Sequence, residues 1–152
     1  MNFRALGLLV LAMGCESARP PASASPAPPS SLHVPLPDGW RGTALSSGLQ
    51  AGPEGRIVLQ LESTTRPLPS LETFLAAVNA EGVEILEKES TAEFVGVRYS
   101  VSTELPAVKR EAFLGVRQLG PRTIWCSTTG SAKSDEVEAA MNVCRSLSWE
   151  GS

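Results

Sequence analysis

A tract rich in proline, alanine and serine limits which part of this chain can fold. Fourteen of the sixteen residues in 16–31 are Ser, Ala or Pro, and five of them are proline. Proline lacks a backbone N–H and has a fixed φ, which excludes a regular helix or a central strand. The tract also has no large apolar side chain whose burial would offset the entropy of ordering. We therefore expect a disordered tether here and one folded domain in the 121 residues of 32–152.

The residues before this tether have the pattern of an export signal. One positive charge, Arg4, precedes an apolar run at residues 5–13. The run is too short to span a bilayer, since a membrane helix needs about 20 residues. It ends in Leu-Ala-Met-Gly-Cys at 11–15, which resembles the lipobox of bacterial lipoproteins. In that family the signal peptide is removed before the cysteine, whose thiol receives diacylglycerol and whose new amino group receives a fatty acid such as palmitate.

This resemblance implies a signal peptide at 1–14, a lipid-anchored Cys15 at the head of the tether in 15–31, and a location in the bacterial cell envelope. Three acyl chains, each contributing about 0.8 kcal/mol per buried methylene, make such an anchor effectively permanent. We expect the domain to face the periplasm. Because Glu16 rather than aspartate follows the cysteine, the outer membrane is favoured over the inner one. A plain secretory signal with an incidental cysteine and a misassigned start codon are the alternatives.

Charge and composition argue against several classes of function. The chain has 13 Lys and Arg against 16 Asp and Glu, and residues 32–152 have 11 against 15, a net charge of −4. Nucleic-acid binding requires clustered cations, so we expect no nucleic-acid partner. The one histidine, His33, is interpreted as a surface or half-buried residue rather than a base or ligand. The chain has none of the common hydrolase, nucleotide-binding or zinc-enzyme motifs, so we expect no enzyme activity, no metal and no cofactor.

Hydrophobic periodicity in 32–152 predicts an α+β fold. Alternating apolar residues predict strands, among them a short one at 32–36, others at 42–50 and 56–63, and a charged one at 83–89 near an edge. Amphipathic patterns predict two helices, one capped by Ser70 and the other by Ser134. The predicted order is β-β-β-α-β-β-β-α, an antiparallel sheet of five to six strands with two helices packed on it.

Two short motifs accompany this order of elements. Pro-Asp-Gly-Trp at 37–40 follows the first short strand, and Ser-Trp at 148–149 follows the last helix. Together with the element order, they resemble the PsbP-like fold, which DcrB-like bacterial lipoproteins share. The resemblance covers about residues 32–150 and implies an α-β-α sandwich with a non-catalytic accessory role. It transfers no functional residue, because the chain has no metal-binding or partner-binding motif to match.

Two cysteines remain once Cys15 is assigned to the lipid. Cys126 falls in the last predicted strand, and Cys144 lies on the apolar stripe of the last helix, which can pack back over that strand. An even pair in an exported chain predicts a disulfide. Two buried free thiols and a redox-active pair are the alternatives, although no Cys-x-x-Cys motif is present to lower a thiol pKa.

The tryptophans are the candidates for a contact surface. Trp125 alternates with Cys126 and therefore faces the other side of the sheet. If that side is open, Trp125 is the best candidate for a partner contact, with Trp40 second. Tryptophans at such positions are more often core residues, which is the alternative.

An acidic run accompanies the predicted edge strand, at Glu81, Glu84, Glu87, Glu89 and Glu93. We interpret it as a solvated strand face, with a weak divalent-cation site as the alternative. Taken together, these features predict a membrane-anchored accessory or protein-binding module whose partner is another envelope protein. A small envelope hydrolase or redox enzyme without a recognisable motif, and a structural envelope component, are the competing functions.

Overall fold

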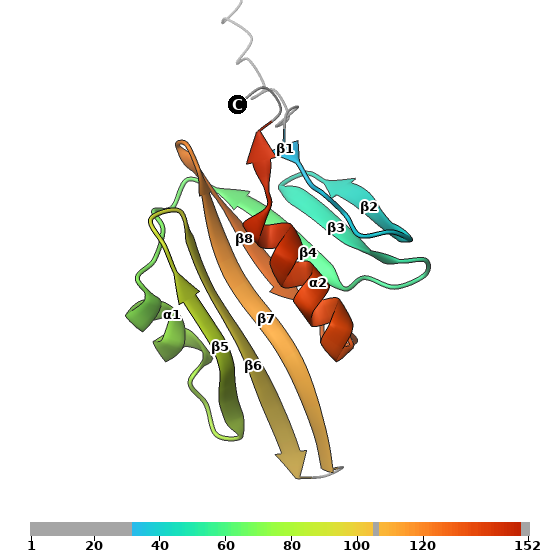
Figure 1. Cartoon of the computed structure of the whole chain (residues 1–152), viewed down its shortest axis with the longest axis vertical. Coiled ribbons are helices and arrows are strands. Elements are labelled where there is room, and N and C mark those ends of the chain that lie inside the picture. Colours follow the sequence, from blue (N-terminus) through green and yellow to red (C-terminus); the bar gives the residue numbers. More distant parts are fainter. Residues whose placement is uncertain (1–31, 105–106, 150–152) are drawn as a thin grey trace, which may run out of the picture.

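The computed structural model describes residues 32–104 and 107–149, so the expectations on the signal peptide, Cys15 and the tether lie outside the described residues. Within this part the chain is α+β, as predicted, with a seven-stranded sheet and a separate two-stranded sheet (Figure 1). The helices are α1 (Leu71–Val78) and α2 (Ser134–Arg145). The strands are β1 (Leu32–His33), β2 (Trp40–Leu45), β3 (Gly48–Pro53), β4 (Leu59–Thr64), β5 (Val83–Ser90), β6 (Phe94–Glu104), β7 (Ala107–Leu119), β8 (Arg122–Thr128) and β9 (Ser148–Trp149).

The main sheet has the order β2-β3-β4-β8-β7-β6-β5, and every neighbouring pair is antiparallel. Among the described residues it therefore has one strand more than the upper limit of the prediction, because four strands rather than three follow α1. The strand predicted at 42–50 is in fact a hairpin, in which Leu45 pairs with Gly48 across a two-residue turn. The predicted first strand is only two residues long and pairs with β9 outside the main sheet.

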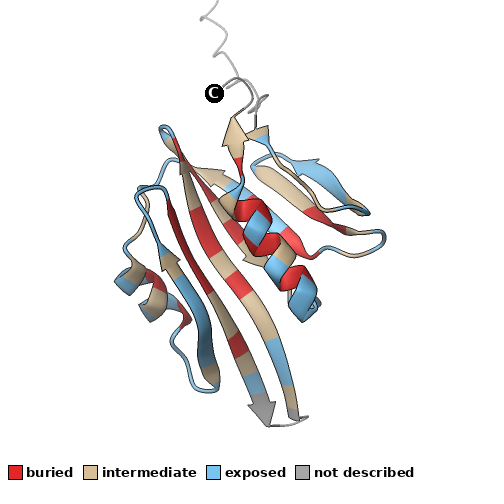
Figure 2. Cartoon of the chain, in the orientation of Figure 1, coloured by how far each residue is buried: buried red, intermediate tan, exposed pale blue. Residues whose placement is uncertain are grey.

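The two helices cover opposite faces of the sheet. On one face α1 buries Phe74 and Val78 in a cluster that also contains three valines, Val95, Val97 and Val116. On the other face α2 contributes to a larger cluster that includes Phe94 and Phe113. Consecutive residues of a strand point to opposite faces, so β6 and β7 are buried on both sides (Figure 2). The two helices and the sheet therefore form an α-β-α sandwich.

The start of each helix has a specific hydrogen bond. Ser70 is the N-cap of α1, as predicted, and its hydroxyl accepts from the Thr73 N–H at 3.2 Å. Ser134 was predicted to cap α2, but it is the first helical residue. The carboxylate of Glu136 accepts from the Lys133 N–H at 2.8 Å instead. The predicted apolar stripe of α2 is confirmed, and its buried members are Val137, Ala140, Met141 and Cys144, followed by Leu147.

A disulfide links β8 to α2. Cys126 and Cys144 are bonded, with 6.2 Å between their Cα atoms and 18 residues of sequence separation. Both side chains are fully buried in the cluster on the α2 face. The predicted pairing is therefore the one present, and it fixes α2 over the centre of the sheet.

Ion pairs tie the charged edge strand β5 to its surroundings. Arg145, at the end of α2, donates to Glu89 at 2.7 Å and to Glu87 at 2.8 Å. Lys109 of β7 donates to Glu84 at 2.8 Å. The acidic side chains of β5 therefore lie on a largely exposed strand and are neutralised by cations from α2 and β7. Within residues 32–104 and 107–149, no group of three or more His, Cys, Asp or Glu side chains is arranged to hold a metal ion.

The ion pair between Arg98 and Glu111 makes the stability of the fold depend on pH. Arg98 Nε donates to Glu111 at 2.9 Å, and the Ser134 hydroxyl donates to the same carboxylate at 2.9 Å. The hydrogen bond from Arg98 lowers the pKa of Glu111, partly opposed by burial and supported by the bond from Ser134. A carboxyl group with a lowered pKa stabilises the fold at neutral pH, and this contribution is lost as the pH falls through the pKa in the folded state.

We therefore expect Glu111→Gln to lower the free energy of unfolding at neutral pH. It should also remove part of the fall in stability between about pH 5 and pH 2, the range in which a carboxyl with a lowered pKa is protonated. Urea unfolding measured across this range is the test, with Glu81→Gln as a control because Glu81 is exposed and forms no ion pair within the described residues. Equal pH slopes for the wild type and Glu111→Gln would contradict the assignment.

Candidate binding surface

One half of the sheet has no helix on the α1 face. The contacts of α1 are chiefly with β5 and β6, at the far side of the sheet from β2, β3 and β4. The strand register aligns four polar residues across the uncovered strands, namely Thr43, Gln50, Gln60 and Ser127. This uncovered half is therefore a polar surface that ends at β2.

The two edges of the sheet differ in how they are protected against further pairing. Edge strand β5 has three glutamates and a lysine, and its pairing with β6 shifts register between Ile85 and Glu87. Charges and irregularities of this kind discourage an added strand. Edge strand β2 has one charged residue, Arg41, an uninterrupted register with β3, and exposed residues from Arg41 to Leu45. Of these two edge strands of the main sheet, β2 is therefore the one with the character of an unprotected edge.

Hydrogen bonds between neighbouring strands fix which backbone groups of β2 face outward. The Val58 N–H donates to the Ala51 carbonyl at 2.9 Å, so Ala51 faces β4 rather than β2. Backbone groups of successive strand residues point to opposite sides, so Gln50 and Gly52 face β2. Their partners Thr43 and Arg41 accordingly face β3. The peptide groups of the intervening residues, Gly42 and Ala44, point away from the sheet.

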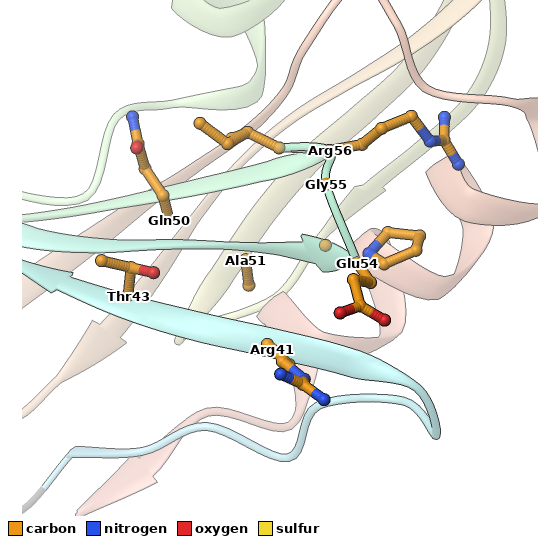
Figure 3. A pocket seen from close by; sticks show the side chains of 10 residues that line it. Arg41, Thr43, Gln50, Ala51, Glu54, Gly55 and Arg56 are labelled. Carbon is orange, nitrogen blue, oxygen red and sulfur yellow. The ribbon is translucent and has the colours of Figure 1, made fainter.

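A polar pocket of about 460 Å³ lies beside β2 on the uncovered face. Arg41, Thr43 and Gln50 line it, together with the turn that contains Glu54 (Figure 3). Arg56 is at its rim but extends toward α2, where it pairs with Glu136 and donates to the Ser131 carbonyl at 3.2 Å. Arg41 has no ion pair within the described part of the chain.

An apolar groove of about 190 Å³ lies on the opposite face of the same strand. No charged residue lines it, and its main walls are Val34, Leu45, Leu49 and Trp149. It exists because the β1–β9 pair stands above the sheet and because β2 has small residues on this face. Ala44 points here, beside the half-buried Leu49, whereas the Leu36 side chain lies close to Gly42 on this face.

The predicted contact residues lie near this surface. Trp125 is half-buried, with its ring centroid 5.6 Å from that of Phe74, and its indole N–H is buried without a hydrogen-bond partner. It also lines a pocket of about 220 Å³ on the uncovered face, with Gln60 and Arg66. Trp40 is half-buried against the core on the α2 side. His33 is exposed in β1 and lines none of these three pockets.

The edge residues Arg41, Gly42 and Ala44 were not recognised from the sequence. The signal for them is a single charge among small residues at 41–44, a composition that leaves an edge strand uncovered.

Within the described residues, no helix has the length and apolar character needed to cross a membrane. A comparison with known proteins finds no family model and no curated protein that matches this chain.

Proposed function

We propose that this protein is a lipid-anchored protein of the bacterial envelope whose domain is a non-catalytic module that binds another envelope protein. The observation that supports it is the unprotected edge strand β2, with a polar pocket on one face and an apolar groove on the other. An exposed edge offers backbone hydrogen bonds to a partner, and pockets on alternate faces select its side chains.

The anchor and the tether fit this function. At about 3.1 Å per residue in an extended polyproline form, the sixteen residues of 16–31 span up to roughly 50 Å. A lipid on Cys15 would therefore confine the domain to a layer close to the membrane and still let it turn its β2 edge toward a partner. The tether is followed directly by Leu32, whose strand β1 lies at one end of the domain (Figure 1).

Photo-cross-linking in intact cells tests the proposal. A benzoylphenylalanine placed at Thr43 on β2 should give a discrete adduct with another envelope protein. The same group at Lys88, an exposed residue of the opposite edge strand, serves as the matched control. Adducts of equal yield and identity at both positions, or none at Thr43, would contradict a binding function for the β2 edge.

A further inference from the structure

We infer that the partner binds β2 as an extended peptide that adds a strand to the sheet, with apolar and acidic side chains in alternation. This inference rests on the proposed function, because it specifies the chemistry of the partner. Addition of a strand to an open edge combines main-chain hydrogen bonds with pockets for alternate side chains. Edge strand β2 offers both kinds of contact.

The backbone contacts come from two residues. Gly42 and Ala44 each present an N–H and a carbonyl away from β3, and both residues are exposed. An antiparallel strand can form paired hydrogen bonds with each of them in turn. At the other end of the sheet, a strand added to β5 would meet Glu84, Glu87 and Glu89 and an irregular register. Of the two edges of the main sheet, β2 is therefore the suitable one.

The apolar groove selects the residues on one face of the incoming strand. A side chain opposite Ala44 would lie over the exposed part of Leu49 and against Trp149. A cavity of about 150 Å³ lined by aliphatic and aromatic groups is enough for a benzene-sized group. The groove, at about 190 Å³, therefore accepts one aromatic or branched aliphatic side chain.

Arg41 selects the residues on the other face. Its side chain and that of Thr43 point to the polar face, next to the positions that alternate with the apolar ones. Arg41 has no ion pair within the described residues, whereas the neighbouring Arg56 is held by Glu136. A carboxylate of the incoming strand is the group that would pair with Arg41.

Two other candidates for the strand that pairs with β2 are disfavoured, namely the chain's own tether and a second copy of the chain. The chain's own tether, 16–31, has five prolines, each without the N–H that a paired strand must donate. A second copy that paired through its own β2 would bring Gly42 and Ala44 to the groove, so the groove would remain empty. The occupant is therefore a peptide of a different protein with larger apolar residues.

The test measures binding of synthetic peptides to the full-length lipidated chain in detergent micelles. One fluorescent peptide alternates phenylalanine and glutamate, and a second has the same composition in two blocks. The alternating peptide should bind at least about tenfold more tightly, since each lost charged or backbone hydrogen bond costs roughly this factor. N-methylation of the alternate peptide amides that face β2 should weaken binding by a similar factor. N-methylation of the other amides, which point away from β2, should not weaken it.

Protein variants give the complementary readout. Ala44→Pro removes an outward N–H without breaking the β2–β3 ladder and should weaken binding, whereas Ala44→Ser should not. Arg41→Glu should reverse the preference, so that a peptide alternating phenylalanine and lysine binds better. Equal affinities for both methylated peptides would overturn the inference. Formation of a dimer of this protein that abolishes peptide binding would also overturn it. If Thr43 cross-links a partner but the alternating peptide does not bind, only this inference fails and the proposed function stands.

Discussion

A Cys15→Ser variant should lose its fatty-acid label and leave the membrane fraction. The apolar run at 5–13 is too short to anchor the chain by itself, so attachment would depend on the acyl chains, each contributing about 0.8 kcal/mol per buried methylene. Metabolic labelling with a palmitate analogue, followed by fractionation of the envelope, measures both effects. This is the largest change that we expect from a single substitution, because it removes the anchor completely.

A displaced thiol is the matched control for this experiment. The double variant Cys15→Ser with Ser17→Cys restores a cysteine two residues downstream, and it should also be unlabelled because the lipobox requires the thiol at its final position. A Cys15→Ser protein that stays in the membrane fraction without lipid would contradict the lipid anchor. The proposed location in the cell envelope would then need another explanation.

Replacement of both Cys126 and Cys144 by alanine should lower the free energy of unfolding by about 3 kcal/mol. The bond joins β8 to α2 across 18 residues of sequence, and a closed loop of this size restricts the unfolded chain by about that amount in the chain-entropy treatment. Both sulfur atoms lie in the core, so alanine leaves only a small apolar gap. Urea unfolding of the double variant and of the oxidised wild type measures the difference.

The reduced wild type separates the bond from the packing of the side chains. Its stability should be close to that of the alanine variant if the covalent link is the source of the effect. Alkylation without a reductant should leave Cys126 and Cys144 unmodified. Addition of two alkyl groups under these conditions would show that the bond is absent in the isolated protein.

Local patterns predicted the helices and the disulfide well. The stripe of α2 and the cap at Ser70 follow from spacing that needs no tertiary information. The Ser134 prediction was wrong for a tertiary reason, because its hydroxyl bonds to Glu111 on β7. The strand predicted at 56–63 begins only at Leu59, and Ile57, which precedes it, is 45% exposed.

The sheet was harder to predict than the helices. In β7, Val116 is buried on the α1 face and Phe113 is equally buried on the α2 face. Alternation cannot indicate which face is buried when helices cover both. The hairpin of β2 and β3 was missed because Ser46 and Ser47 form its turn without the glycine, asparagine or proline that marks most turns.

The candidate surface depends on the lateral order of the strands, which no local pattern contains. The charges of β5 correctly indicated an edge. The other edge, β2, could not be identified while residues 42–50 were taken as one strand. The groove also requires β1 and β9, which come from opposite ends of the domain's sequence, to pair through Leu32 and Trp149.

Amide hydrogen exchange at β2 tests most directly whether this edge pairs with a strand of another protein. The measurement compares the free protein with its complex with the partner recovered by cross-linking at Thr43. The amides of Gly42 and Ala44, which face outward in the free protein, should exchange much more slowly in the complex, while amides of β5 should be unchanged. Exchange at Gly42 and Ala44 as fast as in the free protein, with the partner bound, would contradict strand addition at β2.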